Sequence, residues 1–413
     1  MNEIDRLSIN TIRILSAEAV QKADSGHPGL PLGAAPMAYT LWSRHLKHNP
    51  KNPRWVDRDR FVLSAGHGSM LLYSLLHIFG YDVTIEDIKN FRQTGSRTPG
   101  HPEYGHLPGV ETTTGPLGQG VANAVGMAMA EAHLAAMFNK EGFNIVDHYT
   151  YVLSGDGCLM EGVSAEACSL AGTQKLGKLI LLYDSNRITI EGETDFAFTE
   201  DVGKRFEAYG WQVLEVKDGN EDTGRISSAI EAAKKEKDKP SIIIIHTDIG
   251  YGCPAVQGKA SSHGSPLGGK NIELLKETLG WEYKESFYVP DEVKAAAAQR
   301  QKEYAQAEEK WNAMFARYRE KYPDMALLWD KCFGGADESV LNDASLYKFD
   351  KGMATRASSG IVLNRLAEKL PGLFGGSADL GPSNKSVLNA TAWFSPEHRE
   401  GQNLHFGVRE FAM

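Results

Sequence analysis

The sequence predicts an α/β protein with a doubly wound, mostly parallel sheet, plus the start of a second α/β domain. Short apolar strands recur at 149–153, 179–183, 212–216 and 241–246, with helix-length segments between them. Strands that alternate with helices favour parallel pairing. The 413-residue length is too great for one core, so two domains are expected.

The part of the chain before these strands is predicted to be mostly helical. Apolar residues recur there with helical spacing, and Gly- or Pro-rich turns mark the ends of the segments. The predicted elements are helices 3–23 and 31–46, a strand at 61–64, and helices 69–79 and 121–138. Residues 94–120 are rich in glycine and proline and resist any regular assignment. A loop of this length in a compact protein is usually functional.

The C-terminal part has a different pattern. Residues 290–330 contain no glycine and are rich in Ala, Lys, Glu and Gln, which predicts a long helix over roughly 291–320. A helix at 355–370, a strand at 373–380 and a strand or turn at 403–413 follow. The predicted domains are a first α/β domain at 1–285, a helical linker at 286–345 and an incomplete second α/β domain at 346–413.

Composition bounds the class of protein. Hydrophobic residues make up 42% and charged residues 23%, as in an ordinary globular enzyme. The net charge is -9 and no basic stripe is present, so nucleic acid is not an expected partner. The cysteines form no CxxC pair, which argues against structural zinc and for a reducing compartment. No apolar signal region or run long enough to span a bilayer is recognised, so we expect a cytoplasmic protein without a membrane partner.

Two predicted strand ends carry a candidate metal–diphosphate site. The first strand ends at Gly155-Asp156-Gly157, and the next ends at Asp184-Ser185-Asn186. A helix between parallel strands would place Asp156 and Asn186 side by side at the carboxyl edge of the sheet. A carboxylate and an amide oxygen suit Mg²⁺ or Ca²⁺, which would keep diphosphate oxygens as further ligands. The alternative is a β-turn with one acidic residue, which a lone Gly-Asp-Gly usually is.

Four glycine-containing loops each carry a histidine, namely His27, His67, His101 and His263. Any one of them is more often a structural turn, but four at predicted element ends indicate a pocket lined by imidazoles. The spacings match no zinc signature. Imidazoles that hydrogen-bond a hydroxylated, phosphorylated substrate or move its protons are the better interpretation.

Two further features are weaker. The turn 115–120 precedes a predicted helix and could present backbone N–H groups to a phosphate or a carbonyl to a cofactor ring. Glu161 and Glu166 follow the metal motif on a predicted helix, where a solvated face would explain them equally well.

Taken together, these segments resemble the transketolase family over essentially the whole chain. Six ordered motifs carry the resemblance: Ala23-Asp24-Ser25-Gly26-His27-Pro28-Gly29, Ser64-Ala65-Gly66-His67-Gly68, Gly115-Pro116-Leu117-Gly118-Gln119-Gly120, Gly155-Asp156-Gly157-Cys158-Leu159-Met160-Glu161-Gly162, Gly376-Ser377-Ala378-Asp379-Leu380 and Gly407-Val408-Arg409-Glu410-Phe411. The resemblance implies a thiamine diphosphate-binding fold, in which 1–285 is the diphosphate-binding domain and 346–413 an incomplete pyrimidine-binding domain. It also implies thiamine diphosphate, Mg²⁺ (or Ca²⁺ or Mn²⁺), and reversible transfer of a two-carbon ketol unit in the pentose phosphate pathway. The implied donor is xylulose 5-phosphate, and the implied acceptors are ribose 5-phosphate and erythrose 4-phosphate.

The resemblance also implies roles for residues at the matching positions. The metal would be held by Asp156, Asn186 and the carbonyl of Ile188. The cofactor would contact His67, Gly115, Pro116, Leu117, Gly157, Glu161, Asn186, Ile190, His263 and Asp379. The substrate would contact His27, His263, Arg356 and Ser383, and the implied catalytic residues are His27, His101, His263 and Glu410.

In the implied mechanism, Glu410 hydrogen-bonds the pyrimidine ring and favours the imino form that deprotonates the thiazolium. The resulting ylid attacks the ketose carbonyl. The resemblance further implies a homodimer whose active site lies between subunits, with Glu161 and Glu166 near the partner subunit's Glu410.

The resemblance leaves three alternatives open. Dihydroxyacetone synthase and phosphoketolase share the cofactor, and a half-subunit of a split enzyme would only bind the cofactor or a partner chain. Family members continue beyond the position that matches Met413. We therefore expect the 413-residue chain alone to lack ketol transfer activity.

Overall fold

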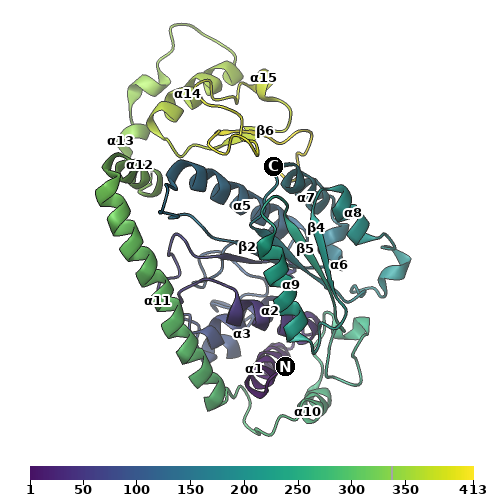
Figure 1. Ribbon diagram of the computed structural model, residues 1–413. Helices are drawn as coiled ribbons and strands as arrows, with labels where there is room; N and C mark the ends of the chain where they lie inside the picture. The colour runs from purple at the N-terminus through teal and green to yellow at the C-terminus, as the bar shows by residue number, and fades with distance from the viewer. Residues whose placement is uncertain (336–337) are drawn as a thin grey trace. The chain divides into compact units, whose positions relative to one another are not determined.

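The structure is a computed structural model that describes residues 1–335 and 338–413 (Figure 1). The chain forms two compact units. The first contains residues 1–128 and 148–308, and the second contains 129–147 and 309–413. Helices α5 (Gln119–Phe138) and α11 (Asp291–Lys321) contribute residues to both units.

The first unit is built on a five-stranded, all-parallel sheet with the order β1-β2-β3-β5-β4. Its strands are β1 (Arg60–Leu63), β2 (Thr150–Gly155), β3 (Leu179–Ser185), β4 (Gln212–Val216) and β5 (Ser241–His246). Every residue of β2 and β3 is buried, as expected for central strands of a parallel sheet that is covered on both faces. The predicted fold class is therefore confirmed.

Helices cover both faces of this sheet. Helix α9 packs against α2 and against strands β4 and β5, while α8 packs against β4. Besides parts of α5 and α11, the helices of this unit are α1 (Glu3–Ala23), α2 (Gly29–Arg44), α3 (Ser69–Phe79), α4 (Ile85–Lys89), α6 (Asp156–Met160), α7 (Gly162–Thr173), α8 (Val202–Ala208), α9 (Thr223–Lys235) and α10 (Gly269–Thr278). Figure 1 shows the strands as arrows between these helices.

The second unit contains a small parallel sheet of β6 (Gly375–Ser377) and β7 (Asn403–His405). Its helices are α12 (Pro323–Phe333), α13 (Glu338–Leu341), α14 (Thr355–Lys369) and α15 (Gly381–Asn384), together with the ends of α5 and α11. Aromatic packing joins several of them: Phe138 and Trp329 lie edge to face with their ring centroids 5.0 Å apart.

Some boundaries differ from those expected from sequence. Helix α2 begins at Gly29, two residues before the predicted start. Strand β6 is limited to three residues because it pairs with only three residues of β7. The segment after Gly155 is a helical turn, α6. Glu161 interrupts it with an extended backbone, so Glu161 lies between α6 and α7 and not on the predicted helix.

Helix α5 corrects the expectation that no segment is long enough to span a bilayer. By length and composition, it is the one helix within the described residues that could cross a membrane, and 44% of its most apolar stretch is buried. A buried core helix meets the same criterion, so this is weak evidence for a membrane span.

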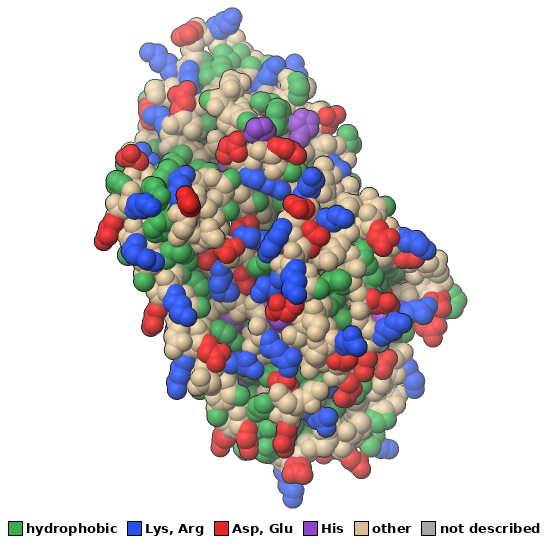
Figure 2. Space-filling view, in the orientation of Figure 1, with side chains coloured by type: hydrophobic (Ala, Val, Ile, Leu, Met, Phe, Trp, Pro, Cys, Tyr) green, Lys and Arg blue, Asp and Glu red, His purple; other side chains and the backbone are tan. Residues whose placement is uncertain are grey.

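Charged side chains of both signs are interspersed over the face of the protein shown in Figure 2.

Candidate functional site

The predicted strand edge brings Asp156 and Asn186 together. Gly155 at the end of β2 is in register with Asp184 near the end of β3, so the residues that follow both strands are neighbours. The Asp156 carboxylate accepts a hydrogen bond from the Tyr183 hydroxyl (2.6 Å) and one from the backbone N–H of Arg187 (3.1 Å). The N–H that reaches Asp156 thus belongs to the residue directly after Asn186.

The donor set fits a divalent cation. Burial, the main effect, raises the pKa of Asp156, which is only 4% exposed, although hydrogen bonds from Tyr183 and from backbone N–H groups oppose the shift. A bound cation would offset the desolvation of this carboxylate. The residues that the structure describes contain no cluster of three or more Asp, Glu, His or Cys side chains able to hold a metal. A cation here would therefore draw on Asp156, amide and backbone oxygens, and oxygens of a ligand.

A cavity of about 110 Å³ lies directly against these residues. It is lined by Leu30, His67, Leu117, Gly155, Asp156, Gly157, Cys158, Asn186, Ile188, Thr189, Ile190, Ile249 and His263. The structure thus brings to one cavity eight residues to which the family resemblance assigns a role, from positions 67 to 263 of the chain.

Two glycines shape this region. A Cβ atom on Gly157 would lie 2.8 Å from Leu117 Cδ1, so any side chain at 157 would require the Leu117 side chain to move. Gly115 has φ +151°, a backbone conformation that other residues rarely adopt, and a Cβ there would lie 3.3 Å from the His101 ring. The loop 115–118 therefore runs between the metal motif and the histidines.

The four predicted imidazoles form one cluster. The His67 and His263 rings stack with centroids 5.0 Å apart, and His27 lies 5.2 Å from His67 and 5.7 Å from His263. His101 lies 6.3 Å from His27. Because His67 and His263 also line the cavity, the cluster stands at one of its walls.

Packing between loops positions these histidines. His101 belongs to the long irregular segment, and the Tyr73 hydroxyl of α3 donates to the carbonyls of Pro99 (2.9 Å) and His101 (3.2 Å). A Cβ on Gly29 would lie 2.6 Å from the Ser262 carbonyl, which shows how closely the start of α2 approaches the loop of His263.

All four imidazoles are held neutral at physiological pH. Burial lowers the pKa of His27 to about 4, with further contributions from His263, Arg92 and His101. Burial also lowers the pKa values of His67, His101 and His263. A neutral imidazole can both donate and accept a hydrogen bond. The buried Nδ1 of His263 has no hydrogen-bond partner within the described residues, as expected of a group that faces a ligand.

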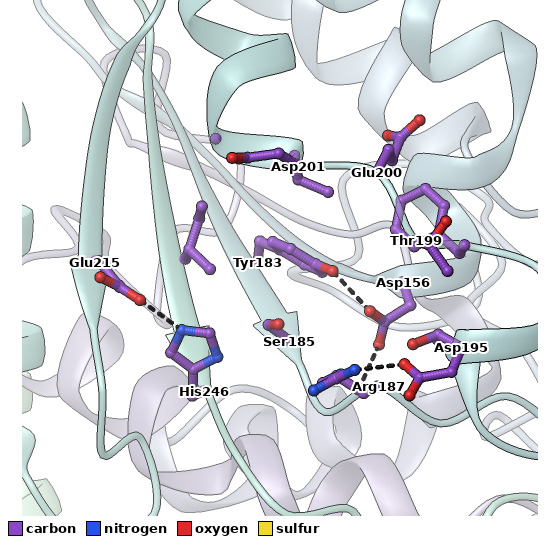
Figure 3. Close-up of a pocket in the computed structure, with 15 residues that line it drawn as sticks. Asp156, Tyr183, Ser185, Arg187, Asp195, Thr199, Glu200, Asp201, Glu215 and His246 are labelled. Carbon is purple, nitrogen blue, oxygen red and sulfur yellow. Dashed lines mark hydrogen bonds and ion pairs between the residues drawn. The ribbon is translucent and has the colours of Figure 1, made fainter.

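A second, larger cavity of about 660 Å³ also borders Asp156 (Figure 3). Asp156 and Tyr183 form part of its wall, together with the Arg187–Asp195 ion pair and the 2.8 Å contact between His246 and Glu215. The Tyr183 hydroxyl points at the Asp156 carboxylate from this side. Asp156 thus borders both cavities.

The remaining predicted residues lie outside the 110 Å³ cavity. Arg356, Ser383 and Glu410 are exposed residues of the second unit. Asp379, with a left-handed φ of +56°, lines a cavity of about 140 Å³ in that unit. In the first unit, Glu161 and Pro116 are exposed. The roles of these residues stay predictions.

Sequence reasoning missed several residues of the site. Leu30, Thr189 and Ile249 line the 110 Å³ cavity, and Tyr183 and Asp184 hold the side chains of Asp156 and Asn186. The last two could have been suspected, because a tyrosine and an aspartate are unusual at the end of a buried strand.

Comparison with known proteins agrees with this geometry. Residues 4–336 match the family described as transketolase, thiamine diphosphate binding domain, and residues 351–413 match the transketolase pyrimidine binding domain. The chain is 56% identical to a transketolase of Halalkalibacterium halodurans over 99% of its own length and 61% of that protein. It is 53% identical to a chloroplastic transketolase of Zea mays, covering 100% of this chain and 61% of the relative.

Solved structures give the same result. A Pichia stipitis transketolase in complex with sedoheptulose 7-phosphate superposes with a TM-score of 0.96 at 47% identity, over 100% of this chain and 62% of that one. A Campylobacter jejuni transketolase gives a TM-score of 0.90 at 48% identity over the same shares. The chain therefore spans about three fifths of the length of these relatives. It belongs to the transketolase family, and residues 4–336 form its thiamine diphosphate binding domain.

Proposed function

We propose that this protein takes part in transketolase catalysis, the reversible transfer of a two-carbon ketol unit from a ketose phosphate to an aldose phosphate. The proposal rests mainly on one cavity. The pair of oxygen-bearing residues Asp156 and Asn186 lines it, and so do His67 and His263 of the imidazole cluster. The first supplies a place for a metal-bound diphosphate, and the second supplies hydrogen-bonding groups for a hydroxylated substrate.

In this proposal, Asp156, Asn186 and the carbonyl of Ile188 hold Mg²⁺, and His67 and the backbone at Gly157 meet the diphosphate. Leu117 and Ile190, which line the same cavity, flank the ring system. Gly115 and Pro116 lie in the loop that approaches it. Thiamine diphosphate, when bound, supplies the electron sink that carbon–carbon cleavage next to a carbonyl requires.

The histidines are suited to orient the substrate and to move its protons. A neutral imidazole accepts a proton from a hydroxyl or donates one to a developing oxyanion, and the cluster offers His27, His101 and His263 for this purpose. Arg356 and Ser383 would bind the substrate phosphate, where a guanidinium suits the charge. Asp379 and Glu410 would contact the cofactor. The relative solved with sedoheptulose 7-phosphate supports a sugar phosphate as the substrate class.

The proposal includes a homodimer, with the active site shared between subunits and Glu161 at the interface. Two large apolar side chains of the segment after β3 are exposed and available to a partner subunit: Ile190 is 66% exposed and Phe196 is 91% exposed. A cytoplasmic location and a role in the pentose phosphate pathway are also proposals. Free cysteines support a reducing compartment, and Cys158, Cys168 and Cys253 are buried.

The first test is cofactor binding by the 413-residue chain. Titration calorimetry with thiamine diphosphate is expected to show saturable binding with Mg²⁺ and at least ten-fold weaker binding with EDTA. The Asp156→Ala variant should lose the Mg²⁺ effect because the charged metal ligand is gone. Absence of metal-dependent binding to the unaltered chain would overturn the proposal.

The second test is turnover by the natural polypeptide that carries this sequence, with its intact mass compared with 45.3 kDa. Xylulose 5-phosphate and ribose 5-phosphate should yield glyceraldehyde 3-phosphate. Activity with formaldehyde but not with ribose 5-phosphate would indicate a dihydroxyacetone synthase instead, and a requirement for inorganic phosphate would indicate a phosphoketolase.

A further inference from the structure

Asp184 is a completely buried carboxylate beside the proposed metal ligands. It lies near the end of β3, with an exposed fraction of 0%, and its partners are both uncharged. Asn186 Nδ2 donates to one carboxylate oxygen (2.9 Å), and the Thr247 hydroxyl, from the segment after β5, donates to the other. No lysine, arginine or histidine pairs with Asp184 among the described residues.

The burial of Asp184 without a cationic partner calls for a functional explanation. A carboxylate without a cationic partner costs free energy to bury, and a threonine and an asparagine only partly offset that cost. Folding alone does not explain a carboxylate here, because an amide of the same shape could accept from Thr247. The contact with the Asn186 amide is the one that specifically requires an acceptor.

We propose that Asp184 is a positioning residue that fixes which end of the Asn186 amide faces the cation. This inference rests on the proposed function, in which the Asn186 oxygen is a metal ligand. An amide side chain has two similar ends, and rotation by half a turn would present its NH₂ group to a cation. Asp184 accepts from Nδ2 and thereby turns Oδ1 away from itself. Oδ1 then accepts a hydrogen bond from the Ile188 backbone N–H (3.0 Å), and Ile188 is the residue whose carbonyl would be the third protein ligand.

The opposite ligand is held in a comparable way. Tyr183, the residue before Asp184, donates to Asp156 Oδ1 and fixes that carboxylate from the other side of the strand. Consecutive residues of β3 thus orient the two side-chain ligands that come from two different loops. Losing a group that orients a metal ligand typically weakens metal binding about 10- to 100-fold.

The test measures Mn²⁺ affinity by electron paramagnetic resonance, with saturating thiamine diphosphate, on the full 413-residue chain. Asp184→Leu keeps a similar shape but removes both acceptor oxygens, so Asn186 Nδ2 loses its partner. We expect its Mn²⁺ Kd to rise at least ten-fold. Asn186→Asp alone places two carboxylates in contact and should weaken binding as well.

The exchanged pair Asp184→Asn/Asn186→Asp is the decisive variant. It keeps the net charge and restores a donor–acceptor pair, because the new amide at 184 can donate to the new carboxylate at 186 and still accept from Thr247. We expect its Mn²⁺ affinity to exceed that of Asn186→Asp at least ten-fold. A structural role for Asp184 alone predicts no such rescue. If Asp184→Leu does not fold, this comparison decides the question by itself.

A matched control is Asp59→Asn. Asp59 is also a buried carboxylate at the sheet, but it accepts from the backbone N–H groups of Lys47 and Tyr149 (both 2.7 Å) at the opposite edge. Its Mn²⁺ Kd should stay within two-fold of the unaltered chain. Failure of the unaltered chain to bind Mn²⁺ would overturn the proposed function. Tight binding by that chain, with Asp184→Leu within two-fold of it or no rescue by the exchanged pair, would overturn the inference alone.

Discussion

Replacing Gly66 by alanine should distort the cofactor cavity through the backbone of a neighbouring loop. A Cβ atom on Gly66 would lie 2.5 Å from Thr114 Oγ1, 2.8 Å from Gly115 N and 2.9 Å from the Thr114 carbonyl carbon. Two of these atoms belong to the main chain, so no side-chain rotation relieves the overlap. Ordinary contact begins near 3.4 Å, so the two main-chain atoms must move by about 0.5–0.6 Å.

The expected loss of stability is that of an overpacked core, about 1–3 kcal/mol. For a unit of this size, each kcal/mol lowers the Tm by about 2–4 °C. The displaced loop leads into Leu117, which lines the cavity beside Gly157, so affinity for thiamine diphosphate should fall as well. Thermal unfolding and titration calorimetry with Mg²⁺ measure the two effects on the same sample.

Gly126→Ala is the matched control. Gly126 lies inside helix α5, and nothing is within 4 Å of the Cβ that alanine would add. Alanine is favoured over glycine in a helix by about 1 kcal/mol, so the Tm should stay the same or rise, with unchanged cofactor affinity. The reasoning is refuted if the Gly66 and Gly126 variants have the same Tm and the same affinity.

Three further outcomes are expected. Tyr183→Phe removes the hydroxyl that donates to Asp156 and should weaken Mn²⁺ binding about 10-fold or more; an unchanged Kd would show that Arg187 N–H suffices to orient the carboxylate. Burial lowers the pKa of His27 from its ordinary 6.5 to about 4 in the folded chain, so the unfolded chain binds the proton more tightly. The stabilising contribution of neutral His27 to folding is therefore fully present above pH 6.5 and is lost as the pH falls toward 4. His27→Gln should therefore flatten the fall in Tm between pH 6.5 and 4, and a profile parallel to that of the unaltered chain would contradict this. Treatment with EDTA should lower the Tm of the chain saturated with Mg²⁺ and thiamine diphosphate, because a ligand that binds only the folded state stabilises it, and added Mg²⁺ should restore it.

The strand and helix pattern was readable from sequence because it depends on local spacing. The apolar runs that form β2 and β3 are typical of strands in a buried parallel sheet. Asp156 and Asn186 follow the ends of these strands, so the geometry of the sheet places them together. Helix α1 has its predicted bounds because Asn2 caps it and Asp24 adopts a left-handed backbone at its end. Glu161 was misplaced because an extended residue between two short helices leaves no periodic signal.

The sequence by itself determined the fold class, because the spacing of apolar residues marks strands and helices. It also determined the family and the glycine loops that carry histidines, because each of these depends on short contiguous motifs. Only the tertiary structure decided that His27, His67, His101 and His263 share one cluster, with ring centroids of 5.0–6.3 Å between the neighbouring pairs. It also decided that Asp184 holds the Asn186 amide and Tyr183 holds the Asp156 carboxylate. These contacts join loops that the sheet brings together from distant parts of the chain, and no local pattern encodes the distance between such loops.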